Sequence, residues 1–251
     1  SASVSTLSLL GYADQALNRL DAALHLAREL SHPFSYAVAL HAAVVLYHHR
    51  RDAPAVQEWA EATIEIATDH EYPQWLAPML VFRGWAMAQR GDVLDGISQM
   101  QQGLSTYQTM RAGIGLPQYF GLMAEIYGNS GQVPKGLASL IEALTLIKTK
   151  GQRVYEAEIY RLQGELLLQD SPNRSELAAE MSFLKSLNSA RGQGMKLREL
   201  RAAVHLGRLW QHQGKRQKAR NLLAPVYNGF TEGFDTADLQ EAHALLAELR
   251  G

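Results

Sequence analysis

The stretch PQYFGLMAEIYGNSGQVPKGLASLIEAL, residues 117–144, contains two amphipathic segments separated by a break that is rich in turn residues. Its first half carries apolar or small residues at the i, i+3, i+4 and i+7 positions of a helix: Phe120, Met123, Ala124 and Tyr127. In the segment GNSGQVP, glycine tolerates a turn and proline fits the first turn of a following helix. The stretch therefore predicts two helices joined by a short connection.

The same pattern returns along the chain with a period of 40 residues. One residue marks the break in each repeat, the last after an interval of 43: Gly11, Arg51, Gly91, Gly131, Ser171 and Gly214. A large apolar residue stands four positions before each marker: Leu7, Tyr47, Met87, Tyr127, Leu167 and Trp210. The second segment of each repeat has a small or β-branched residue in a fixed column: Ala16, Val56, Gly96, Gly136, Ala179 and Ala219. A repeat of about 20–50 residues is typical of solenoid proteins.

We therefore predict an all-α fold, a right-handed α-α superhelix of about six helix pairs followed by a C-terminal capping helix. Sustained period-two alternation is missing from the sequence, which argues against strands. The predicted single solenoid domain covers 1–251, divided into these units and a cap: 1–32, 33–72, 73–112, 113–152, 153–193, 194–233 and 234–251.

Three places depart from the regular period. In the fifth unit, the three extra residues predict a longer loop at DSPNRS, residues 170–175. The amphipathic segment Thr236 to Leu249 is expected to cap the array, because an unstacked apolar face would otherwise meet water. The first unit begins too late to complete its opening helix, so we expect the chain to be a piece of a longer protein.

Composition limits the classes of partner. A net charge of −1 over 251 residues gives no strong field toward nucleic acid or an anionic membrane, and neither is expected as a partner. The absence of cysteine excludes disulfides and thiolate zinc sites. The N-terminal residues lack a basic region and a long apolar run, so no signal peptide is predicted. A cytoplasmic location is expected.

The spacing of large, small and aromatic columns resembles the tetratricopeptide (TPR) pattern, with longer units than the usual 34 residues. Such long units resemble the TPR-like arrays of bacterial STAND-type signalling ATPases, including the maltose-regulator type. Three runs look like the C-terminal ends of bacterial proteins that join an adenylyl cyclase or kinase domain, an ATPase domain and a TPR tail: YEAEIYRLQGELLLQ (155–169), AAEMSFLKSLNSAR (178–191) and the segment 197–249. The resemblance implies a regulatory tail whose catalytic domains lie elsewhere.

The sequence gives no sign of catalysis of its own. The segment at Gly214 lacks the upstream glycine of a G-x-x-x-x-G-K-[ST] phosphate-binding loop, and the motif set of a protein kinase is missing. His41 and His48 are two helical turns apart, too far to share one tetrahedral ion. We therefore predict a non-catalytic protein without a cofactor or a metal.

In TPR arrays the first helix of each pair lines the concave groove, and the register selects the candidate partner-binding residues: His41, Val45, His48, Trp85, Gln89, Glu125, Asn129, Glu158, Arg161, Glu165, Arg201 and Arg208. One interpretation is a mixed groove with Trp85 as an exposed aromatic anchor. The other is that Trp85 packs between helices and that Arg161 pairs with Glu158 and Glu165 along its own helix.

The predicted function is a recognition scaffold for a protein, a peptide or other domains of the parent chain, and it would serve as a sensing or regulatory tail. Two alternatives stay open. The apolar edges of the array could pair between chains and form a homo-oligomer. The superhelix interior could instead sense a small molecule in an aromatic-lined cavity, for which Tyr119, Phe120, Tyr155 and Tyr160 are the candidates.

Overall fold

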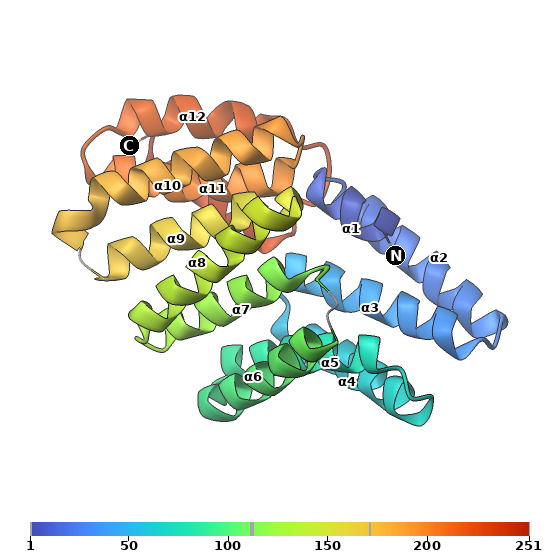
Figure 1. The fold of residues 1–251 in the computed structure, drawn as a ribbon. Coiled ribbons are helices and arrows are strands. Elements are labelled where there is room, and N and C mark those ends of the chain that lie inside the picture. Colours follow the sequence, from blue (N-terminus) through green and yellow to red (C-terminus); the bar gives the residue numbers. More distant parts are fainter. Residues whose placement is uncertain (1, 111–112, 171, 251) are drawn as a thin grey trace.

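A computed structural model describes residues 2–110, 113–170 and 172–250, and thirteen α-helices account for most of them (Figure 1). A single 3₁₀ turn, Arg153–Tyr155, precedes α9. The helices are α1 (Ala2–Leu9), α2 (Ala13–Glu29), α3 (Pro33–His49), α4 (Ala53–Asp69), α5 (Pro73–Gln89), α6 (Val93–Thr109), α7 (Leu116–Asn129), α8 (Val133–Lys150), α9 (Glu156–Asp170), α10 (Pro172–Gly192), α11 (Lys196–His212), α12 (Arg216–Asn228) and α13 (Ala237–Glu248). Consecutive helices pack in antiparallel pairs, so the chain is an all-α, TPR-like solenoid.

The 40-residue marker is the residue that ends the first helix of a pair in a left-handed conformation. Gly131 has a φ of 75°, and the same region is adopted at Gly11, Gly91, Gly214 and Arg51. The amide of the next residue, Gln132, donates to the carbonyl of Tyr127 at 2.7 Å, which satisfies a carbonyl that the helix leaves free. The large residue four positions before each of these five markers is therefore the acceptor of this bond. The remaining marker, Ser171, lies outside the described residues.

The small columns lie where two helices cross closely. At the α5–α6 crossing, Gly84 and Gly96 face each other, and a Cβ on either one would come within 2.5 Å of the carbonyl oxygen of the other. Ala16, Val56, Ala179 and Ala219 are fully buried at the corresponding places of other pairs. The approach of the two backbones thus explains why glycine is used inside these helices despite its conformational cost of about 1 kcal/mol.

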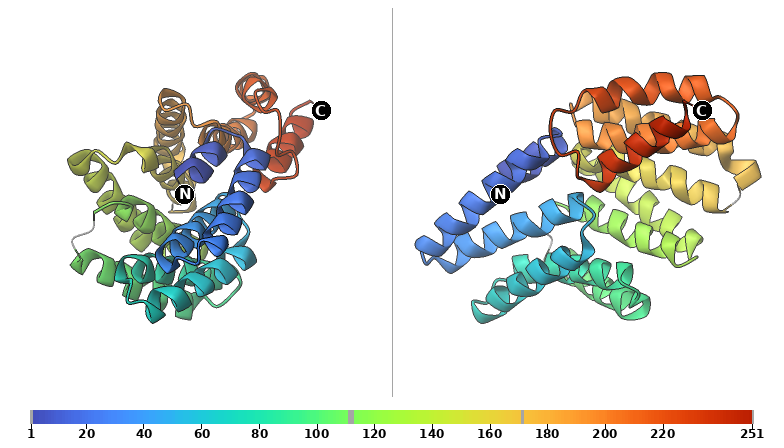
Figure 2. Two further views of the ribbon diagram at one scale, coloured as in Figure 1. Left: turned by 90° about the vertical axis from the view of Figure 1, so that its right-hand side faces the viewer. Right: turned by 180° about the vertical axis from the view of Figure 1, so that it is seen from behind.

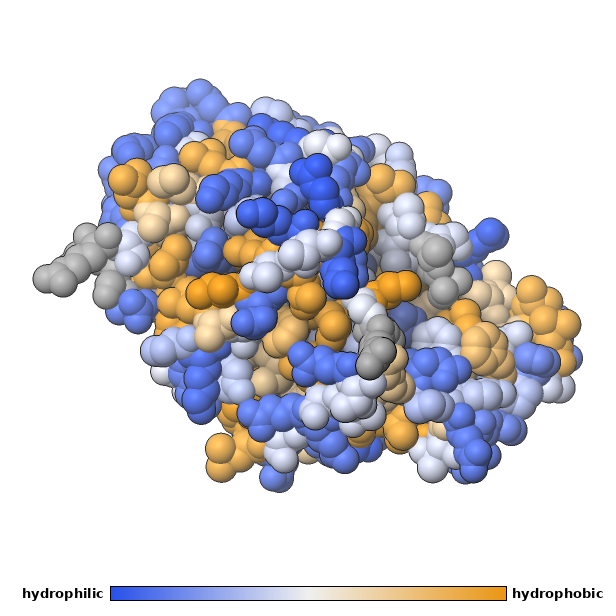
Figure 3. Space-filling model, in the orientation of Figure 1, coloured by the Kyte–Doolittle hydropathy of each residue, from blue (hydrophilic) through white to orange (hydrophobic). Residues whose placement is uncertain are grey.

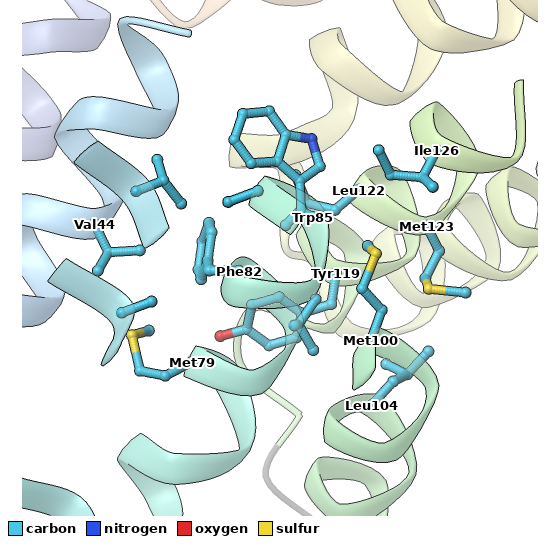
Figure 4. Close-up of a cluster of buried hydrophobic side chains, with 14 of the residues drawn as sticks. Val44, Met79, Phe82, Trp85, Met100, Leu104, Tyr119, Leu122, Met123 and Ile126 are labelled. Carbon is cyan, nitrogen blue, oxygen red and sulfur yellow. The ribbon is translucent and has the colours of Figure 1, made fainter. Parts of the chain in front are cut away.

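The largest apolar cluster lies between α3, α5, α6 and α7. Figure 4 shows Trp85 above Phe82 and Tyr119, with Met100 and Met123 on the neighbouring helices. A second cluster fills the space between α10, α11, α12 and α13. Because α13 buries Leu239, Leu245 and Leu246 there, the predicted capping helix covers the end of the array.

The loop predicted at 170–175 is wrong. The helix α10 begins at Pro172 and is 21 residues long, whereas α2, α4 and α6 have 17. Proline at the first helical position needs no backbone hydrogen-bond partner, and it allows the helix to start early. The extra residues of the fifth unit therefore lengthen a helix.

The array turns back on itself, so that its first and last helices meet. In Figure 2 the blue helices at the N-terminus lie beside the orange and red helices, and α1 packs against α11. Several contacts join the two ends. Arg201 Nη2 donates to the carbonyl of His49 at 2.6 Å, Arg50 pairs with Asp235 at 3.0 Å, and Glu232 accepts the amides of Asp14 and Gln15 at the start of α2. The concave face is thereby enclosed along its whole circumference.

On the face seen in Figure 3, hydrophobic and hydrophilic residues are interspersed. Of the helices described, none combines the length and the apolar character that crossing a bilayer requires.

Substituting Gly84 with alanine should lower the free energy of unfolding by about 2 kcal/mol, because the added methyl group overpacks the α5–α6 crossing. Urea unfolding followed by far-UV circular dichroism measures the change. The matched control is Gly192→Ala at the end of α10, where a Cβ meets nothing within 4 Å. Equal stability of the two variants would contradict the close approach.

Candidate functional site

A polar cavity of about 530 Å³ lies on the concave side of the array. The first helices of the second to sixth pairs line it, together with the start of α4 and the polar face of α13. Ten of the twelve candidate residues selected from the register are among its lining residues: His48, Trp85, Gln89, Glu125, Asn129, Glu158, Arg161, Glu165, Arg201 and Arg208. The 40-residue repeat therefore selected side chains that lie together in the structure. Their role in binding a partner stays a prediction.

Exposed polar side chains from four helix ends form the mouth of the cavity. We call this set the rim: Arg51, Gln89, Arg90, Asn129 and Arg208. They lie in the last or next-to-last turn of a first helix, or directly after it. Arginine is favourable there because the C-terminal end of a helix carries partial negative charge. The rim can contact a ligand without disturbing the core, since its side chains are already in water.

Buried ion pairs centred on Glu158 form the floor of the cavity. Its carboxylate contacts Arg161 Nη2 at 2.6 Å and Arg198 Nη1 at 2.7 Å, with Arg201 Nη1 at 3.9 Å. Burial alone would raise the pKa of Glu158, but the three guanidinium groups outweigh it and hold the pKa well below its usual range. The carboxylate is therefore ionised and ties α9 to α11.

Two further sets of ion pairs continue this network toward the rim. Arg161 also contacts Glu165 at 2.7 Å, which confirms the predicted pairing along its own helix. Arg201 binds Asp238 of the capping helix at 2.8 Å. Glu241, one turn further on α13, is shared by Arg51 at 2.7 Å and Arg208 at 3.0 Å. The capping helix thus contributes two carboxylates to the wall and joins the second helix pair to the sixth.

The carboxylate on the opposite wall, Glu125, is bound by neutral donors. Glu125 of α7 accepts hydrogen bonds from Trp85 Nε1 at 3.1 Å and from Gln89 Nε2 at 2.8 Å. Burial raises the pKa of Glu125. His48 meets the indole of Trp85 edge-on, with ring centroids 4.8 Å apart, and burial lowers the pKa of His48 to about 3. The imidazole is therefore neutral at physiological pH.

The structure decides between the two interpretations of Trp85 and corrects two candidate residues. Trp85 is only 3% exposed, so it packs between helices and is not an exposed anchor. Val45 is buried in the apolar cluster around α5, and His41 packs against Trp75, with ring centroids 5.1 Å apart. Neither Val45 nor His41 reaches the cavity. Both side chains pack against neighbouring helices and do not face the axis of the array.

The expected aromatic-lined cavity is also wrong as stated. Tyr119 lies in the apolar core, edge-on to Tyr107, and Tyr160 lies under Lys185. Tyr155 reaches only a small hollow of about 20 Å³ beside Glu158. Charged and amide groups line the large cavity instead.

Sequence analysis missed Arg51, Arg90, His205, Asp238 and Glu241 in the wall, and Arg198 behind it. The sequence contained a pattern that could have identified some of these residues. Side chains about 40 positions apart meet across neighbouring first helices, as Trp85 meets Glu125 and Glu158 meets Arg198. Charge complementarity at that offset would have found Arg198 and His205. No repeat-based signal could have found Asp238 and Glu241, because the capping helix is outside the repeat.

The cavity suits recognition by charge and hydrogen bonds. None of the described lining residues carries a hydroxyl or thiol nucleophile. In the described part of the chain, no group of three or more His, Asp or Glu side chains is arranged to hold a metal ion.

No family model matches the chain. An uncharacterized protein of Rhizobium meliloti (strain 1021) is 25% identical over 179 residues, which cover 71% of this chain and 17% of that protein. The matched part of the chain therefore spans about a sixth of the length of this relative. Among solved structures, BtubC (BKLC) from P. vanneervenii has a TM-score of 0.56 at 16% identity, over 81% of this chain and 89% of that one. Aspartyl phosphate phosphatase F from Bacillus subtilis has a TM-score of 0.57 at 14% identity, over 89% and 57% of the two chains. These two structures share the fold with this chain.

Replacing Glu158 with glutamine should lower the free energy of unfolding by about 3 kcal/mol at pH 7, because Arg161 and Arg198 lose their shared carboxylate. Chemical denaturation at pH 7 measures this loss. The matched control is Glu142→Gln on an exposed part of α8, which should change stability by less than about 0.5 kcal/mol.

The stability that Glu158→Gln loses should also depend on pH. A carboxylate whose pKa is depressed in the folded state stabilises the fold above its ordinary pKa, and the contribution disappears as the pH falls below that value. The difference between wild type and Glu158→Gln should therefore shrink on acidification. A difference that stays constant between neutral and acidic pH would contradict the ion-pair account.

Proposed function

We propose that this chain is a non-catalytic recognition scaffold that binds a polar, charged segment of a partner protein at the rim and in the central cavity. The observation that carries the proposal is the convergence of exposed rim side chains from four separate helix ends on one cavity of about 530 Å³. Underneath, ion pairs hold the floor in place, so a ligand would meet a preformed surface. The occupant could be a separate protein or another domain of the parent chain.

The parent is proposed to be a larger bacterial signalling protein of the STAND type, with this chain, 1–251, as a single solenoid domain near its C-terminus. The sequence runs at 155–169, 178–191 and 197–249 support this context, as does the small share of its much longer relative that the chain covers. Binding would regulate the parent by favouring one arrangement of its domains over another. Deleting the array from the full-length parent would then change its output activity, and unchanged output would argue against a regulatory role.

A small polar ligand is the second candidate. The cavity volume falls within the range of about 300–1,000 Å³ that is usual for small-molecule sites. Native mass spectrometry of the purified protein distinguishes the two, because a small ligand that copurifies adds a discrete mass. Self-association through the α1 edge is less well supported, since α11 of the same chain packs there.

A photocrosslinking amino acid placed at Gln89 on the rim should capture a partner in cells of the source organism. Gln102 is the matched control, because it is an exposed glutamine on α6 that does not line the cavity. Capture should fall at least about tenfold when Arg90→Ala and Arg208→Ala are combined, since each exposed arginine at an interface can contribute more than about 1 kcal/mol. The pair Lys148→Ala and Lys150→Ala on α8 should leave it unchanged.

Equal capture from Gln89 and Gln102 would contradict binding at the rim. So would capture from Gln89 that the two arginine substitutions do not affect. Circular dichroism of each variant should match wild type, because both arginines are exposed and lie outside the apolar clusters.

A further inference from the structure

Glu125 differs from every other carboxylate that lines the cavity. The other four each have a guanidinium nitrogen within 3.0 Å: Glu158, Glu165, Asp238 and Glu241. Glu125 is held only by two neutral donors, the indole of Trp85 and the amide of Gln89. Among the described residues, no cationic side chain forms an ion pair with it. The wall therefore contains one carboxylate that is positioned by hydrogen bonds but not neutralised.

A buried carboxylate without a cation is costly, and it is relieved either by a proton or by a positively charged partner. Arg161 lies near enough to favour the charged form, while Glu158 and Glu165 oppose it. The cations that could move toward Glu125 are already bound to other groups. Arg161 bridges Glu158 and Glu165, and Arg201 binds Asp238. When Glu125 is ionised, the described residues thus offer it no ion-pair partner, and a cation in the cavity would favour the ionised form.

The surroundings of Glu125 suit a compact cation. The indole N–H of Trp85 and the amide of Gln89 use two of the roughly four acceptor positions of the carboxylate, which leaves positions for a further donor. His48 beside the indole is neutral and adds no repulsion. Asn129 is one turn further along α7, is exposed, and lines the same cavity, so its carboxamide oxygen can accept a further hydrogen bond. A primary ammonium group has three N–H donors to share among such acceptors.

We propose that Glu125 anchors a subsite for a primary ammonium group, supplied by a lysine side chain or a free amino terminus of the bound segment. The inference rests on the proposed function, since it names the chemical group that the cavity receives. Glu125, Trp85 and Asn129 form the subsite. The exposed guanidinium groups of Arg90 and Arg208 lie at the rim, where their remaining N–H donors can meet the peptide carbonyls or acidic groups that flank the ammonium.

The test uses the indole of Trp85 as a reporter in the full chain. The protein has four tryptophans, so a ¹⁵N-labelled sample gives four indole signals, and Trp85→Phe assigns the one of interest. The probes are Nα-acetyl-lysine amide, which offers a side-chain ammonium, and glycinamide, which offers an α-ammonium. Nα-acetyl-norleucine amide is the uncharged control. We expect a saturable shift of the Trp85 signal with one or both ammonium probes and none with norleucine.

Glu125→Gln should weaken probe binding at least about tenfold, because it removes the charge but keeps a hydrogen-bond acceptor for Trp85. Glu125→Asp keeps the charge and should weaken binding less than glutamine does. Glu142→Gln on α8 should leave binding unchanged. If Glu125→Gln perturbs the fold, the other three indole signals will report it, and the comparison then rests on Glu125→Asp and Asn129→Ala against wild type.

A norleucine shift as large as that of lysine overturns the subsite, and so does unchanged lysine binding by Glu125→Gln. If neither ammonium probe binds while the crosslink at Gln89 persists, the ammonium subsite fails and the proposed function stands. If the probes bind but Gln89 captures no partner, the proposed protein-binding function fails and the subsite remains as a site for a small amine.

Discussion

The arrangement of this molecule depends on the bonds that Arg201 makes. Its guanidinium binds Asp238 of the capping helix and donates to the carbonyl of His49 at the end of α3. One side chain on α11 therefore holds the last helix and the second helix pair at the same time. Through Glu158 the same network reaches α9, so the ends of three first helices are fixed around one axis. These connections form one side of the cavity, and they hold two of the four helix ends that carry the rim, those of α3 and α11.

Apolar packing and polar contacts stabilise different parts of this fold. The apolar clusters lie between adjacent helices and stabilise each pair against its neighbours, which is the usual source of stability in a solenoid. The concave face is held by ion pairs and hydrogen bonds, whose geometry is directional. Trp85 belongs to both systems, since its ring packs in the cluster around Phe82 and its N–H group orients Glu125. This double role explains why the indole is part of the wall although its ring is buried.

The sequence predicted what depends on local repetition and failed where distant parts meet. The helix pairs and the turn at Gly131 follow from periodicity, and the cap at Leu239 follows from the amphipathic pattern of its own segment, because each depends on nearby residues. The early start of α10 was missed, since proline signals a loop and a helix start equally well. The burial of Trp85 depends on His48 and Tyr119 from neighbouring repeats. The contacts of Arg201 with His49 and Asp238 depend on how far the whole array curves, and no single repeat encodes that.

The meeting of α1 with α11 fixes the length of the array. An open solenoid can gain or lose a repeat and keep its form, because each unit contacts only its neighbours. Here the amides at the start of α2 find their acceptor in Glu232, and Arg50 finds Asp235, only when the number of intervening pairs is right. Inserting or deleting one helix pair would separate these partners. The contacts between the first and last helix pairs therefore depend on the number of pairs between them, and a repeat can be added or removed here only by giving these contacts up.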